Sequence, residues 1–198
     1  MKEAAQFEKA IAAFDEYNSN DPNKEQFKEN SFPKELLYAQ RMSTKLSEFR
    51  PDATEDLKLA ARSQHIGRWE IPRSSYPMDQ GGYLKWRGQL KIHHSKIAER
   101  ILTASGYDSE MIDKVKSLLM KKQLLPGSGT QLLEDIICLV FIEFYLSDFA
   151  AKHEEEKVID IIMKTMKKMS PEAIVEAGKL SVDQSILTFL ERAANKLS

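Results

Sequence analysis

The sequence predicts an all-α fold, a single-domain helical bundle of about eight or nine helices over residues 1–198. Three observations predict it. Apolar residues recur at helical spacing along almost the whole chain, and no alternating strand pattern of useful length interrupts them. The chain has 198 residues, 42% of them hydrophobic, which is enough for one continuous core.

The first helix is predicted by Phe7, Ile11 and Phe14, which stand at i, i+4 and i+7. Residues 18–33 are polar and contain Pro22, so they are expected to form a long connection without regular structure.

Two shorter helices follow, and then an irregular segment. Pro33 is placed to start the second helix, Pro51 ends it, and Thr54 caps the third. Residues 67–82 contain three glycines and two prolines, which predicts a loop. This loop is rich in Arg, Trp and Tyr, side chains that a mere linker does not need.

The second half of the chain is predicted to be helical almost throughout. A long helix covers residues 83–105 and is closed by Gly106. Residues 131–149 are apolar almost all round, which favours a central buried helix. Further amphipathic helices are expected at 111–119, 158–166, 171–180 and 183–194.

Composition excludes several classes of protein. The 29 basic residues are offset by 30 acidic ones, which argues against a protein that coats nucleic acid. No apolar run approaches the ~20 residues of a membrane span, and the first residues are already charged, so neither a membrane segment nor a signal peptide is expected. The single cysteine, Cys138, fits a reducing compartment. We therefore expect a soluble, cytoplasmic protein.

One set of candidate site residues has the chemistry of metal ligands. His65, His93, His94, Glu134 and Asp135 lie on several predicted helices, and such groups can converge on one divalent ion. Neighbouring helical residues point about 100° apart, so only one of the two adjacent histidines faces inward, and periodicity does not choose between them. The carboxylate pair interrupts an apolar helix, where burial requires an Arg, a Lys or a metal as partner. The alternative is an arginine partner with ordinary structural histidines.

A second set has the chemistry of an anion site. Within thirty residues, basic side chains alternate with aromatic ones, namely Arg62, Arg68, Arg73, Lys85, Arg87 and Lys91 with Trp69, Tyr76, Tyr83 and Trp86. Guanidinium groups bind phosphate through two parallel hydrogen bonds, and aromatic faces stack on a ligand. These residues therefore indicate a site for a small phosphorylated molecule. The alternative is that the two tryptophans anchor the loop while the arginines pair with surface acids.

The run LAARSQHIG at residues 59–67 resembles the helix that carries the signature dyad of HD-domain phosphohydrolases. Gln64-His65 stands where that family has His-Asp, and Tyr38 in the run YAQRM stands where its first histidine would be. His93 or His94 resembles the later helical histidine, and Asp135 the final aspartate. The resemblance implies an HD-like fold and a divalent metal ion.

A closer resemblance, over most of the chain, is to the family called domain of unknown function 4202. It is carried by QHIGRW at 64–69, IPR at 71–73, YP at 76–77, GYL at 82–84, WR at 86–87, and 133–141 from LED to LVF. This resemblance implies a variant of the HD-like helical fold and leaves catalysis open.

Together these features predict a metal-dependent phosphohydrolase that acts on a nucleotide or another small phosphate ester. The metal (Mn, Fe, Zn or Mg) would activate a bound water, with His65, His94 and Asp135 as ligands and Glu134 and Asp135 as catalytic carboxylates. Substrate would be held by Arg41, Arg62, Arg68, Arg73, Tyr76 and Arg87. We expect Asp135 to reach an arginine, a histidine or an ion, and to point towards His65.

Two other interpretations fit parts of the sequence. A non-catalytic module of degenerate HD-like fold, binding a small molecule or anion, is favoured by the replacement of two expected ligands. HIGR at 65–68 and KKMS at 167–170 are similar to the nucleotide motifs of class I aminoacyl-tRNA synthetases. Those motifs need a parallel sheet, which this sequence does not predict, so we set this activity aside.

Overall fold

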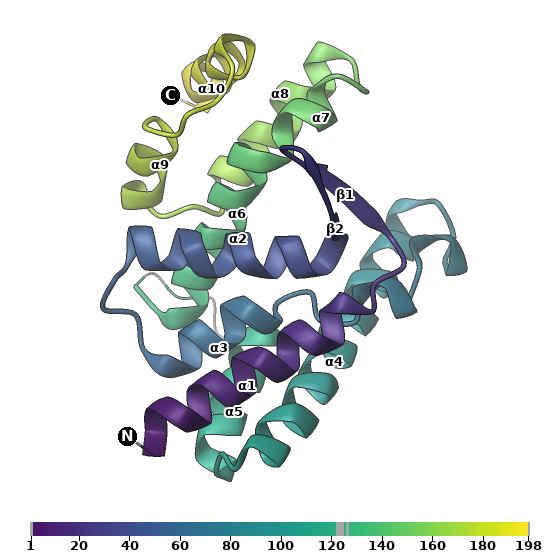
Figure 1. Ribbon diagram of the computed structural model, residues 1–198. Helices are drawn as coiled ribbons and strands as arrows, with labels where there is room; N and C mark the ends of the chain where they lie inside the picture. Colours follow the sequence, from purple (N-terminus) through teal and green to yellow (C-terminus); the bar gives the residue numbers. More distant parts are fainter. Residues whose placement is uncertain (1, 122–124, 126, 198) are drawn as a thin grey trace. The chain divides into compact units, whose positions relative to one another are not determined.

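A computed structural model describes residues 2–121, 125 and 127–197. The chain forms two compact units, Met1–Lys122 and Gln123–Ser198, and each is described by itself. The predicted all-α class is confirmed, because the described residues are mostly helical and their strands form one two-stranded sheet (Figure 1). The single-domain organisation and the HD-like label stay predictions.

The first unit is built from helices that pack around a shared core. They are α1 (Lys2–Ser19), α2 (Lys34–Phe49), α3 (Glu55–Ser63), α4 (Gln80–Ser105) and α5 (Ser109–Leu119). The helix α4 packs against α1 and α5, and α3 packs against α2 and α5. Their apolar stripes meet at the fully buried side chains Phe14, Met42, Leu46, Leu59 and Leu102.

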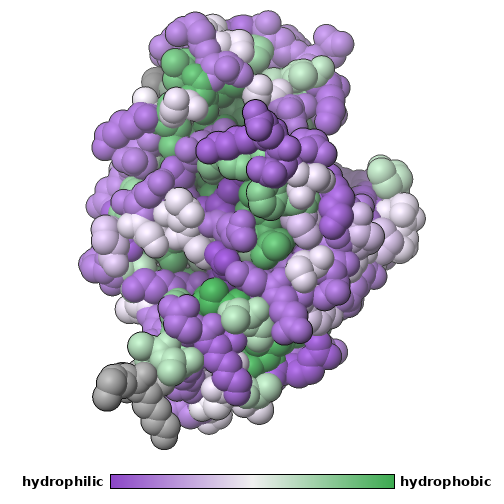
Figure 2. All heavy atoms as spheres, in the orientation of Figure 1, coloured by the Kyte–Doolittle hydropathy of each residue, from purple (hydrophilic) through white to green (hydrophobic). Residues whose placement is uncertain are grey.

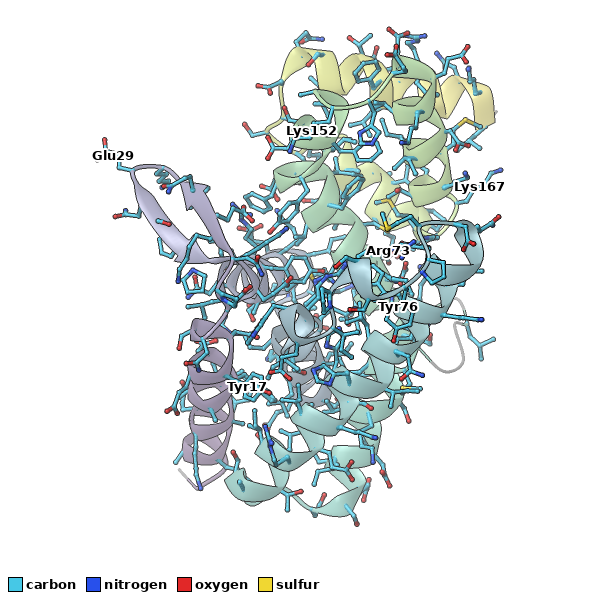
Figure 3. The ribbon with its side chains drawn as sticks, turned by 90° about the vertical axis from the view of Figure 1, so that its right-hand side faces the viewer. Tyr17, Glu29, Arg73, Tyr76, Lys152 and Lys167 are labelled. Carbon is cyan, nitrogen blue, oxygen red and sulfur yellow. The ribbon has the colours of Figure 1, made fainter. Side chains whose placement is uncertain are left out.

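The connection expected at residues 18–33 contains a β-hairpin, which corrects the prediction of an irregular segment. Strand β1 (Lys24–Phe27) pairs antiparallel with β2 (Asn30–Pro33). The turn includes Lys28 in the left-handed region (φ 55°), and Glu29 lies at its tip (Figure 3). Strands of four residues are too short to show an alternating pattern, which explains why the sequence did not predict them.

The loop expected at 67–82 is irregular apart from two short 3-10 turns, η1 (Arg68–Glu70) and η2 (Arg73–Ser75). It begins at Gly67, whose φ of +67° suits glycine, and a Cβ there would lie 2.5 Å from the Cδ1 atom of Ile97. The loop ends where the Asp79 carboxylate accepts a hydrogen bond from the backbone N–H of Gly82 (2.6 Å) and caps α4.

The second unit contains α6 (Gly129–Phe144), α7 (Leu146–Ala150), α8 (Glu155–Met166), α9 (Pro171–Ala177) and α10 (Gln184–Leu197). The helix α6 packs against α7 and α9, and α8 packs against α10. The single helix expected at 131–149 is divided at Tyr145, whose backbone (φ −126°, ψ −18°) leaves the helical region. The apolar run contains no glycine or proline to signal this break.

The surface of the protein is largely hydrophilic, as the high content of charged residues in the sequence predicts (Figure 2). Hydrophilic side chains cover most of the face shown in Figure 2. Within the described ranges, no helix has both the length and the apolar character that crossing a membrane requires.

Candidate functional site

A small pocket lies in the first unit, where the end of α3 meets α4. Its wall is formed by Gln64, His65, Arg68, Arg87, Leu90, Lys91, His94, Leu119 and Lys121. The atom-free space, including the open mouth, is about 260 Å³. The turn that carries the first of these residues is held in place by Ile66, which is fully buried, and by the backbone N–H of Gly67, which donates to the Asn18 side chain (3.3 Å).

His94 is a buried wall residue of the pocket with one engaged ring nitrogen. Its Nδ1 lies 2.6 Å from the carbonyl oxygen of Ile66. A carbonyl only accepts hydrogen bonds, so Nδ1 carries the proton and Nε2 carries the lone pair. Burial lowers the pKa of His94 to about 3, with a smaller effect from Arg68, so the ring is neutral.

His93 points elsewhere and does not contribute to the pocket wall. Its Nε2 lies 3.2 Å from the carbonyl oxygen of Gly67 and 3.2 Å from a carboxylate oxygen of Glu70. Periodicity did not distinguish the two adjacent histidines, and His94 is the one at the pocket.

His65 is held from three sides. Its ring stacks on Tyr38 (centroids 4.1 Å apart), its Nδ1 lies 3.3 Å from an oxygen of Glu35, and its Nε2 lies 3.1 Å from Nη1 of Arg68. A guanidinium only donates, so Nε2 accepts and Nδ1 donates to the carboxylate. Burial, followed by Arg68, lowers the pKa of His65 well below its usual value and keeps the ring neutral.

Glu35 is a site residue that sequence reasoning missed. It lies in the first turn of α2, where its backbone N–H donates to Asp21 (3.0 Å), and it is only 6% exposed. Burial raises the pKa of Glu35 to about 7, against the opposing effect of Arg68. An acid at a helix start is normally a solvated partner of the helix dipole, so the sequence carried no signal of its burial. Its three-residue spacing from Tyr38 places both on one face of α2, where both contact His65.

Arg68 is fixed by a carboxylate and by an aromatic ring. Its Nε lies 3.7 Å from Glu35, and its guanidinium lies 4.7 Å from the ring centroid of Trp86. Trp86 is buried and its Nε1–H donates to the carbonyl oxygen of Ile71 (2.8 Å). Trp86 thus anchors the 67–82 loop, as one interpretation expected, and also positions a cation at the pocket.

Arg87 and Lys91 bring further positive charge to the wall. They stand four residues apart on α4 and therefore lie on the same face of the helix. Neither forms a hydrogen bond or an ion pair with any residue that the structure describes. The pocket therefore presents cations whose charge the described part of the protein does not neutralise.

Arg41 and Arg62, expected to bind substrate, are engaged in other contacts. Arg41 pairs with Glu25 and lies over the ring of Phe27 (4.9 Å), both on the hairpin. Arg62 forms a bidentate ion pair with Asp15, in which Nε lies 2.7 Å from Oδ1 and Nη2 lies 2.5 Å from Oδ2. Neither belongs to the pocket wall, and each guanidinium is paired with an acid on a neighbouring element.

Arg73 and Tyr76 lie together on the loop (Figure 3). Arg73 donates to the carbonyl oxygens of Tyr76 (3.0 Å) and Asp79 (3.2 Å). These bonds close the loop on itself, and neither residue belongs to the pocket wall.

Asp135 lies in the second unit, buried and with its carboxylate satisfied. It accepts from the backbone N–H of Ser170 (2.8 Å), the hydroxyl of Ser170 (2.7 Å) and the amide of Gln131 (3.0 Å). These neutral donors differ from the arginine, histidine or ion that we expected, because the start of α9 supplies an N–H and a hydroxyl together. The neighbouring Glu134 lies 4.0 Å from Nζ of Lys168. The predicted metal ligand set of His65, His94 and Asp135 stays a prediction.

The family described as Domain of unknown function (DUF4202) matches residues 8–190. The chain belongs to this family. Comparison with curated proteins and with solved structures gave no match. The whole pocket wall and Glu35 fall within the residues matched by DUF4202.

The pocket of this DUF4202 protein does not by itself fit a metal ion. Both ring nitrogens of His65 are engaged, and the wall also carries Arg68, Arg87 and Lys91, whose positive charge repels a metal ion. In the part of the chain that the structure describes, no group of three or more His, Cys, Asp or Glu side chains is arranged to hold a metal. The metal ion that the resemblance implies therefore stays a prediction.

Proposed function

We propose that the pocket in the first unit binds a small phosphorylated molecule. The observation that carries the proposal is the pair Arg87 and Lys91, which lines a concave site without a counter-charge among the described residues. Arg68, held by Trp86 and Glu35, adds a third donor whose direction is fixed. Cations gathered around a neutral His65 and His94 repel one another, and an anion with several oxygens relieves that repulsion.

The size of the pocket limits the ligand. Its atom-free space of about 260 Å³ includes open solvent at the mouth, so the enclosed part is much smaller. The ligand that we propose is therefore inorganic phosphate, or the phosphate end of a longer molecule, bound at the open mouth with its remainder in solvent.

Equilibrium dialysis with radiolabelled inorganic phosphate, at low ionic strength and with a chelator present, tests the proposal. Arg87→Gln should weaken phosphate binding about 10- to 150-fold, because a charge-assisted hydrogen bond is worth roughly 1.5–3 kcal/mol.

The matched control is Lys85→Gln. Lys85 is an exposed cation of α4, two residues before Arg87 and outside the pocket wall. Its removal changes the net charge equally and should leave affinity within about twofold, since a screened surface charge contributes little. Equal affinity in the two variants would contradict the proposal.

A further inference from the structure

The pocket wall contains hydrogen-bond acceptors as well as cations. His94 is 4% exposed, and its Nδ1 is engaged by Ile66, so Nε2 is the ring nitrogen left for a ligand. This nitrogen forms no hydrogen bond with any described residue. A buried imidazole beside Arg68 and Arg87 that donates its Nδ1 proton to a carbonyl offers a lone pair at Nε2.

Gln64 supplies a second acceptor. The residue is 6% exposed and belongs to the same wall. Its Oε1 is buried and has no hydrogen-bond partner among the described residues. A buried carbonyl oxygen without a partner costs free energy, which a ligand that donates a hydrogen bond would recover.

We infer that the ligand carries a hydrogen-bond donor beside its anionic group, and that Gln64 and His94 select for this donor. The inference rests on the proposed function, because the cations must first hold the anion. A P–OH group of phosphate or a hydroxyl group of a phosphate ester meets the requirement. Sulfate, and a phosphate ester without a hydroxyl, leave both acceptors unpaired, and a site with unpaired buried polar groups rejects such ligands.

Two matched pairs of dianions test the inference by equilibrium dialysis at pH 8. The first pair is inorganic phosphate against sulfate, and the second is glycerol 3-phosphate against propyl phosphate. All four carry about two negative charges at this pH, so the members of each pair differ chiefly in the donor. The donor-bearing member of at least one pair should bind about 10-fold more tightly. A preference confined to the first pair places the donor on phosphorus, and one confined to the second places it on the organic part.

Variants assign the preference to residues. Gln64→Met and His94→Phe should reduce the ratio of affinities within the favoured pair, whereas Arg87→Gln should weaken all four ligands and preserve the ratio. His93→Phe, whose side chain lies outside the wall, is the control and should leave the ratio unchanged. Gln64→Met keeps the test valid if loss of the Ile66 hydrogen bond prevents the His94 variant from folding.

The outcomes separate the selectivity for a donor, the role of Gln64 and His94, and the phosphate site itself. Equal affinities within both pairs overturn the selectivity and leave the phosphate site standing. A ratio that persists in the folded Gln64 and His94 variants overturns their role. If none of the four dianions binds, the proposed function fails and the inference fails with it.

Discussion

Glu35 is the buried acid beside the pocket, and its protonation is linked to the stability of the fold. Burial raises its pKa from the ordinary 4.5 to about 7. Between these values the native state holds a proton that the unfolded chain has released, so the native state loses stability as the pH rises. Above about pH 7 the loss is complete.

Glu35→Gln should remove this dependence on pH. Between pH 5 and pH 8 the parent protein should lose on the order of 3 kcal/mol in unfolding free energy through this group, and the variant should not. The lowered pKa values of His65 and His94 make stability rise with pH, because the unfolded chain binds more protons at these histidines than the native state does. Both proteins contain these histidines, so comparing the two cancels most of this contribution.

Urea denaturation across this range measures the effect. Glu16→Gln, at an exposed position of α1, is the control and should follow the parent protein. A variant at Glu35 that keeps the full drop in stability would show that its carboxyl does not titrate as described.

At the scale of elements, two glycines of α4 should respond oppositely to the same substitution. A Cβ at Gly82 would lie 2.1 Å from the carbonyl oxygen of Pro77, whereas one at Gly88 meets nothing within 4 Å. Gly82→Ala should therefore destabilise by about 1–3 kcal/mol by displacing the loop, and Gly88→Ala should stabilise by about 0.5–1 kcal/mol. Thermal unfolding followed by circular dichroism distinguishes them. Stabilisation by both changes would mean that the loop at Pro77 moves away from the new methyl group without cost, which would contradict the prediction.

The start of α9 depends on a carboxylate of α6. The Ser170 hydroxyl donates to Asp135 (2.7 Å) and accepts from the backbone N–H of Ala173 (3.2 Å), so Ser170→Ala removes a cap and a hydrogen bond to a buried charge. We expect a loss of about 2–3 kcal/mol in urea denaturation. Ser128→Ala removes the cap of α6, with no carboxylate contact, and should cost about 1 kcal/mol. Equal losses would contradict the role of Asp135.

At the scale of the whole chain, the resemblance to HD-domain phosphohydrolases predicts His65, His94 and Asp135 as metal ligands. If they bind a metal, His65→Ala and Asp135→Ala should each abolish stoichiometric Mn, Fe, Zn or Mg in protein purified without chelator, and His94→Ala should matter more than His93→Ala. Elemental analysis by mass spectrometry measures this. Metal retained in both of the first two variants would remove this ligand set, and metal-free protein that binds phosphate would favour the binding module.

The helices could be predicted from the sequence, whereas the hairpin and the helix break that separate them could not. Amphipathic periodicity located segments such as 83–105 because a helix buries one stripe whatever its partner is. The hairpin at 24–33 escaped because its strands are short, and the break at Tyr145 escaped because the run remains apolar across it.

The sequence predicted the chemistry of the candidate site but only some of the residues that form it. His65, His94, Arg68 and Arg87 were chosen from the sequence and line the pocket. Lys91 belongs to the basic set that the sequence indicated, whereas Gln64 and Lys121 of the wall and the buried Glu35 carried no signal of their place at the site. A charged or amide side chain is buried by what packs over it, and that information is absent from its own segment.

By itself, the sequence determined the helical class and the residue types available for binding an anion, because both follow from local spacing and side-chain chemistry. Only the tertiary structure decided which of the cations are available at the pocket to pair with a ligand. Arg62 and Arg68 are six residues apart and alike in sequence context, yet Asp15 neutralises the first while Trp86 and Glu35 hold the second at the pocket. Ion pairs form between groups that folding brings within a few ångströms, often from distant parts of the chain, so partnership is a property of the fold.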